Sequence, residues 1–196
     1  IIDKAKSSQS TEFIFIDVGN KFYRLLYFII SITLKRKGYS CYFLFKNTSS
    51  DLRSDTLIYN NFKLSNSLYQ KTRFLETIGN LPPEKYRPSY NIDLKNKKII
   101  IGELNYFDLI EACLRPKYKI YSIDYSNDTI ISEINKMVES CRLIVGYFLM
   151  IREYQKENNC NIKFVAKENI YIPASVIRML CAFYNNENSL EYIGLA

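Results

Sequence analysis

The chain of 196 residues contains no histidine and no tryptophan. Without histidine it cannot form His-based zinc sites or Ser-His-Asp and Cys-His nucleophile systems, and it lacks the usual general base at neutral pH. If the protein activates a hydroxyl group, a carboxylate must therefore take the proton. This absence limits the range of activities more than any other feature of the composition.

Glycine, proline and cysteine are also few, at 6, 5 and 5 residues. Because 47% of the chain is hydrophobic, the composition excludes a disordered or collagen-like protein and predicts a folded domain. The cysteines are odd in number and have no CxxC spacing, a pattern that indicates reduced thiols and a cytoplasmic location. The polar lead-in 1–12 does not have the pattern of a signal peptide.

Long hydrophobic runs are missing as well. The most apolar stretches cover residues 25–34 and 143–151, and each is well short of the ~20 residues that span a bilayer. The sequence therefore predicts buried helix faces at both places.

What the chain does have is an alternation of apolar strands and helices. A strand over 13–17, a helix over 21–37 and a strand over 40–45 form a unit that is typical of a parallel sheet covered on both faces. Further strands are expected over 57–64, 97–102, 119–124, 161–166 and 190–196, and further helices over 68–78, 106–114, 127–157 and 173–184. We therefore expect a three-layer Rossmann-like α/β domain over 13–196, with a mostly parallel sheet of about five or six strands. We also expect this domain to be the N-terminal half of a longer two-domain protein.

Polar residues follow three of the expected strands at their carboxyl ends. Such ends share one edge of a parallel sheet, and ligands of open α/β sheets bind beyond that edge. The sequence therefore predicts that these side chains meet in one cleft. They are Asp17, Gly19, Asn20, Asp124, Glu168 and Tyr171.

Within this set, Glu168 and Asp17 are the candidate catalytic residues, and the other four are candidate substrate-binding residues. Glu168 is the candidate carboxylate base. Structural roles compete with these, because Asp17 and Asp124 suit helix caps or turns and Glu168 suits a solvated loop. The turn after the first strand has one glycine where a dinucleotide fingerprint has three, which argues against NAD or FAD.

The formal net charge of +7 fits a nucleic-acid surface, an anionic membrane surface or an acidic small molecule. It also fits lysines that are simply solvated at helix ends and turns. Tyrosine and phenylalanine follow strand and helix patterns that bury them, so we expect no specific nucleic-acid partner.

The order of the elements, with a long helix before FVAKENIYIPASVIRMLCAFYNN (164–186), resembles the N-terminal half of GT-B-type glycosyltransferases of capsule and other cell-surface polysaccharide synthesis. The resemblance implies the acceptor-side domain of a nucleotide-sugar-dependent transferase, whose partner is a glycan or lipid-linked acceptor. It implies a location in the cytoplasm or at the inner face of the membrane. No cofactor or metal is expected in this chain, because the nucleotide-sugar donor of such enzymes binds mainly in a C-terminal domain.

A second interpretation stays open. The same layout suits a non-enzymatic nucleotide- or partner-binding domain of flavodoxin type, in which Asp17 and Asp124 would be structural or Mg²⁺-related.

Overall fold

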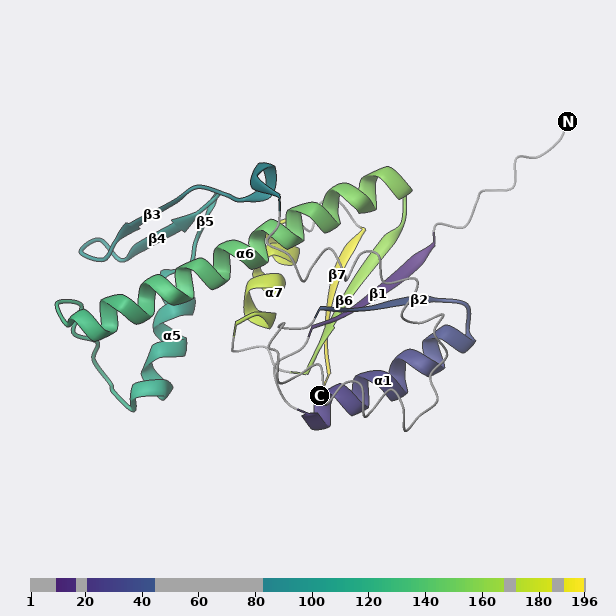
Figure 1. Ribbon diagram of the computed structural model, residues 1–196, viewed down its shortest axis with the longest axis horizontal. Helices are drawn as coiled ribbons and strands as arrows, with labels where there is room; N and C mark the ends of the chain where they lie inside the picture. The colour runs from purple at the N-terminus through teal and green to yellow at the C-terminus, as the bar shows by residue number, and fades with distance from the viewer. Residues whose placement is uncertain (1–9, 17–20, 45–82, 168–171, 185–188, 196) are drawn as a thin grey trace, which may run out of the picture.

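The computed structural model describes residues 10–16, 21–44, 83–167, 172–184 and 189–195. The elements are β1 (Thr11–Ile16), α1 (Lys21–Arg36), β2 (Ser40–Leu44), the 3-10 turn η1 (Glu84–Tyr86), β3 (Tyr90–Asp93), β4 (Lys98–Ile101), β5 (Leu104–Asn105), α5 (Phe107–Tyr118), α6 (Asp128–Asn158), β6 (Asn161–Ala166), α7 (Ala174–Phe183) and β7 (Leu190–Gly194). They form two groups, a larger sheet with α1 and α7 and a smaller sheet with α5, and α6 runs along both (Figure 1). The strand expected over 57–64 and the helix expected over 68–78 lie outside the described residues.

The larger sheet is parallel and has the strand order β2-β1-β6-β7. Alternate residues of β1 face opposite layers. Ile14 and Ile16 belong to the core that α6 and α7 cover, whereas Phe15 packs with Tyr27 of α1 on the other face. The predicted three-layer α/β arrangement of helices on both faces of a parallel sheet is therefore confirmed.

The predicted number of parallel strands is wrong, because the described parallel sheet has four. The strand expected over 97–102 instead forms β4, the middle strand of a separate antiparallel sheet with the order β3-β4-β5. The turn before β4 explains this pairing. Asp93 accepts hydrogen bonds from the backbone N–H and the side-chain amide of Asn96, and Lys97 takes a positive φ of 55°, so that the chain reverses into a hairpin.

The strand expected over 119–124 is absent from the structure. Helix α5 does not end before Pro116 but continues to Tyr118, and Lys119 ends it in the left-handed conformation. The residues that follow form a connection to α6, in which Tyr121 is 98% exposed while Ile123 is buried. A single buried side chain anchors this segment, and it gives no face that could join a sheet.

Helix α6 agrees closely with its prediction. Asn127 caps it, because its Oδ1 accepts hydrogen bonds from the backbone N–H groups of Thr129 and Ile130. Its 31 residues make it about 46 Å long. The predicted stripe on one helix face is buried, and it consists of Ile130, Ile134, Val138, Cys141 and Val145.

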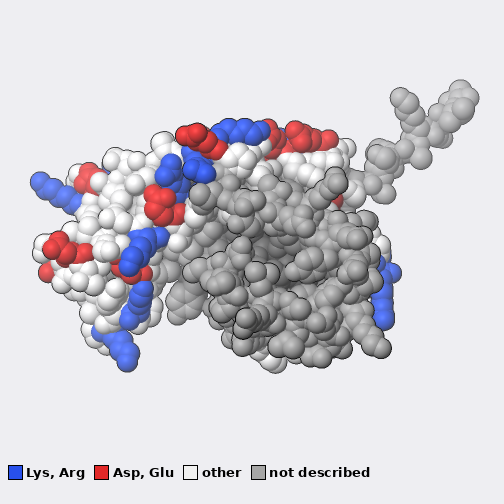
Figure 2. Space-filling model, in the orientation of Figure 1, with Lys and Arg blue, Asp and Glu red and all other residues white. Residues whose placement is uncertain are grey.

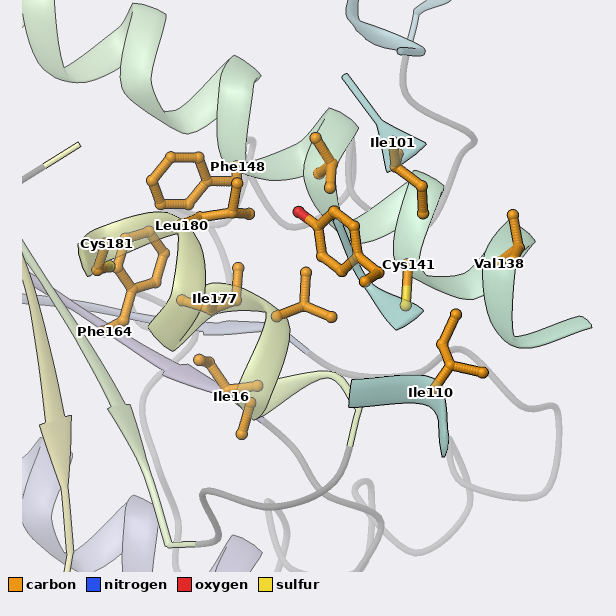
Figure 3. Close-up of a cluster of buried hydrophobic side chains, with 14 of the residues drawn as sticks. Ile16, Ile101, Ile110, Val138, Cys141, Phe148, Phe164, Ile177, Leu180 and Cys181 are labelled. Carbon is orange, nitrogen blue, oxygen red and sulfur yellow. The ribbon is translucent and has the colours of Figure 1, made fainter. Parts of the chain in front are cut away.

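One hydrophobic core joins the two sheets through this helix. Figure 3 shows Phe148, Phe164 and Leu180 at one end of the cluster, and Val138 and Ile110 at the other. The ring of Phe148 on α6 stacks on that of Phe164 at 5.6 Å and on that of Tyr184 at 5.8 Å. As expected, no described helix combines the length and hydropathy needed to cross a bilayer.

The position of Phe148 gives a direct test of this core. We expect Phe148→Ala to lower the free energy of unfolding by about 3–5 kcal/mol, because it removes a fully buried ring that contacts β6 and α7. Urea denaturation followed by circular dichroism measures the change. Asn135→Ala on the exposed face of α6 is the matched control, with an expected change within about 0.5 kcal/mol. An equal effect of the two substitutions would contradict the packing described above.

Candidate functional site

The carboxyl edge of the parallel sheet has a topological switch point between β1 and β6. These strands are neighbours, with Phe15 opposite Val165. From β1 the chain runs through α1 to β2 on one side, and from β6 it runs through α7 to β7 on the other. In open α/β sheets the crevice between two such strands is where ligands bind.

Several hydrogen bonds fix the backbone at this edge. The backbone N–H of Lys167, the first residue after β6, donates to Tyr27 Oη at 2.7 Å. Tyr27 is fully buried on α1, so α1 determines the direction in which the chain leaves β6. The N–H of Leu195 donates to the carbonyl oxygen of Ala166 at 2.8 Å and ties the end of β7 to the same point.

Two helices begin at this edge, one on each face of the sheet. Neither α1 nor α7 has an acidic residue in its first turn, so no side chain of that turn offsets the positive end of the helix dipole. Helix α7 also lacks a side-chain cap. In its first turn Ser175 is 6% exposed, and its hydroxyl has no hydrogen-bond partner among the residues that the structure describes. Such helix ends favour negatively charged groups.

Five of the six predicted site residues lie in the two segments that follow β1 and β6 in the sequence. Asp17, Gly19 and Asn20 lie in the segment 17–20, and Glu168 and Tyr171 lie in 168–171, both outside the described residues. The strands that precede these two segments, β1 and β6, are adjacent and parallel. The convergence of the five residues stays a prediction.

The reason for grouping Asp124 with them is wrong, because no strand precedes it. Asp124 is exposed in the connection between α5 and α6. Asp124 Oδ1 accepts a hydrogen bond of 2.6 Å from the hydroxyl of Ser126 and one of 2.9 Å from the backbone N–H of Ser126. Both hydrogen bonds lower the pKa of Asp124. These contacts are those of a turn residue, the structural alternative that the sequence left open.

A buried carboxylate that the sequence analysis missed lies near the opposite, amino end of the sheet. Glu12 is 8% exposed on β1, and its Oε1 accepts a hydrogen bond of 3.1 Å from Tyr154 Oη of α6. Burial raises the pKa of Glu12, and hydrogen bonds from Tyr154 and Tyr42 offset part of that shift. The sequence does hold a signal for it, because Glu12 shares the inward face of β1 with Ile14 and Ile16.

The cysteines do not offer a nucleophile. They form no disulfide in the described part of the chain, where four of the five are buried. Burial raises the pKa of Cys41 to about 11 and those of Cys141 and Cys181 to about 12. It also raises the pKa of Cys113 and of Cys160. A reactive cysteine has a lowered pKa, because the thiolate is the attacking species.

Charged residues around α5 and α6 alternate in sign. Lys85 on η1 pairs with Glu153 at 3.2 Å, and Arg115 pairs with Glu111 at 3.0 Å. Figure 2 accordingly shows basic and acidic side chains interspersed on this side of the molecule. The outer face of α6 has a shallow hollow whose described lining comes from that helix alone. Within the described ranges no cluster of three or more Cys, Asp and Glu side chains forms a metal site.

Comparisons with known proteins do not indicate a function for this chain. No protein-family model matches the chain, and neither the curated proteins nor the solved structures yielded a match.

The raised pKa of Glu12 predicts how stability depends on pH. Folding favours the protonated carboxyl group, so its contribution is complete below the unfolded-state value of about 4.5 and is lost as the pH rises through the folded-state pKa. We expect Glu12→Gln, which is neutral at every pH, to raise the melting temperature at pH 7 by about 2–4 °C, the response of a domain of this size to about 1 kcal/mol.

At about pH 4 the difference should disappear, because the wild-type carboxyl group is then protonated as well. Exposed Glu103 provides the control substitution, Glu103→Gln, which should leave the pH profile unchanged. Destabilisation by Glu12→Gln at pH 7 would mean that Glu12 is more stable ionised than neutral.

Proposed function

We propose that this domain binds an anionic small molecule, a nucleotide or a phosphorylated sugar, in the crevice beyond the carboxyl ends of β1 and β6. The observation that carries the proposal is the pair of oppositely directed crossovers from neighbouring strands. This arrangement leaves an opening between the loops, whereas crossovers in one direction would cover it.

The strand order supports the flavodoxin-like interpretation. Counted along the chain, the four described parallel strands have the order 2-1-3-4, which agrees with the beginning of the flavodoxin-type order 2-1-3-4-5. In that layout the ligand binds between the first and third strands, which correspond to β1 and β6 here.

The surroundings of the crevice favour a negative charge on the ligand. The first turns of α1 and α7 carry no acid, and backbone N–H groups at such helix ends bind phosphate. Lys167 follows β6 at the same edge and adds a cation. These features act together and need no metal ion.

Glycosyl transfer is the second candidate, and the unit that carried the resemblance supports it. That unit is formed as expected, with β6, α7 and β7 in succession and β7 parallel to β6. In a glycosyltransferase of this type the crevice would take a glycan or lipid-linked acceptor, Glu168 would be its base, and the nucleotide-sugar would bind mainly in a further C-terminal domain.

Titration calorimetry with ADP, UDP, FMN and inorganic phosphate tests the ligand-binding proposal. We expect at least one of these anions to bind, and Lys167→Glu to weaken its binding about tenfold, or about 1.4 kcal/mol, because a negative charge replaces a positive one at the crevice. Lys136→Glu on the outer face of α6 is the control and should bind as the wild type does. The proposal is wrong if none of the four anions binds to the wild type. It is also wrong if Lys167→Glu binds the anion as tightly as Lys136→Glu does.

A separate measurement tests the glycosyltransferase proposal. In the full-length protein, Glu168→Gln should lower the rate of sugar transfer by roughly 10²-fold or more without changing the melting temperature, because it removes the proposed base. Turnover that stays at the wild-type level would leave Glu168 without a catalytic role. Binding of ADP or FMN without any sugar transfer would favour the flavodoxin-like interpretation.

A further inference from the structure

Helix α1 has an apolar face on each of its two sides. Its inner side packs on the sheet, where Tyr27 and Ser31 are buried. On its outer side Phe22 is 68% exposed and Ile29 is 52% exposed, and the two residues are seven apart and so lie on the same side of the helix. The buried helix face predicted within 25–34 is present at Tyr27 and Ser31, whereas Ile29 of the same stretch is exposed.

The charge of the chain is concentrated in the same region. Residues 18–50 contain six Lys and Arg and no Asp or Glu, so this stretch accounts for six of the seven positive charges in the net charge of +7. Three of the basic residues, Lys35, Arg36 and Lys37, follow one another at the end of α1, and Arg36 and Lys37 are exposed. A partner for this region has to supply the negative charge itself.

Helix α1 lies on the face of the parallel sheet opposite α6 and α7 (Figure 1). Its 16 residues make it about 24 Å long, too short to cross a bilayer but long enough to lie along one. Apolar residues on one side and basic residues at the end are the features of helices that lie in the lipid interface.

We propose that the outer face of α1 docks on an anionic lipid surface. Phe22 and Ile29 enter the boundary between headgroups and acyl chains, and the cations at the end of α1 bind the anionic headgroups. A second copy of the chain fits this face less well. In a two-fold symmetric pair the same patch would meet itself, and neither copy would bring a carboxylate from residues 18–50 to pair with the cations.

The absence of tryptophan allows a direct measurement of insertion. Phe22→Trp gives the full chain a single tryptophan at the proposed contact. We expect its fluorescence to shift to shorter wavelength on addition of vesicles with 30 mol% phosphatidylglycerol, and to stay unchanged with pure phosphatidylcholine. Tyr121→Trp is the matched control, because Tyr121 is 98% exposed between α5 and α6, and it should show no shift with either vesicle.

Vesicle co-sedimentation tests the basic residues and the apolar residues of the proposed contact separately. Replacing Lys35, Arg36 and Lys37 with alanine should weaken binding to the anionic vesicles on the order of a hundredfold, because each basic residue near such a surface raises the affinity about fivefold and the three factors multiply. Phe22→Glu combined with Ile29→Glu should abolish binding. Melting curves of these variants must match the wild type, since all five side chains are on the outer side or at the end of the helix.

Three results would overturn the proposal. The first is a failure of the wild type to bind anionic vesicles at low salt, and the second is binding to these vesicles by the variant with both Phe22→Glu and Ile29→Glu. The third result is a wild-type dimer in sedimentation velocity that the same double substitution dissociates. The last result would assign the face to self-association instead. These measurements record vesicle binding and oligomeric state and not ligand binding in the crevice between β1 and β6, so their outcome is distinguishable from that of the proposed function.

Discussion

The fold depends on the burial of one side of α6. Along its length the helix covers two sheets, with Val138 in the core beneath the antiparallel sheet and Phe148 in the core on the parallel one. In the described part of the chain the antiparallel sheet has three short strands, and its buried side chains Ile99 and Ile101 belong to the same core as those of α6. Because both sheets share the same helix, a displacement of α6 would expose apolar surface in both. The two groups of elements are therefore one unit thermodynamically, although the ribbon shows them side by side.

The crevice depends on α6 as well, because the end of α6 determines where β6 enters the sheet. Asn159 ends the helix in the left-handed conformation, and Gln155 Nε2 donates to the carbonyl oxygen of Cys160 at 2.9 Å just before β6. At the same end, Tyr154 holds Glu12 of β1. These contacts fix β1 and β6 beside each other at their amino ends. Tyr27 then orients the chain where it leaves β6. The switch point is thus supported from both ends of the strands, which keeps its position independent of the loops themselves.

The elements that could be predicted from the sequence are those whose signals are local. Asn127 before a long 3.6-residue pattern predicted the start of α6, and the apolar run of β6 predicted a central strand. The apolar run of β4 also predicted a parallel strand, but its pairing is decided by the turn at Asp93 and Asn96, which a strand pattern does not include. Residues 119–124 have the apolar content of a short strand, but α5 continues to Tyr118 and these residues connect it to α6. Without that strand, the reason for placing Asp124 at the edge of the parallel sheet is lost. Glu12 was overlooked because its partner, Tyr154, is distant in sequence and close only in the folded chain.

The pairing of β1 with β6 also has a consequence for how the chain folds. Phe13 lies opposite Lys163, so the two strands are separated by 150 residues, while β1 and β2 are separated only by α1. During synthesis at about 5–20 residues per second, β1 is complete about 8–30 s before its second neighbour leaves the ribosome. Over that interval one edge of β1 and the apolar side chains of Ile14 and Ile16 have no sheet or helix to cover them. Contacts of such long range slow folding, and an open strand edge is prone to aggregate. The early β1–α1–β2 unit is therefore the part of the nascent chain that most needs a chaperone.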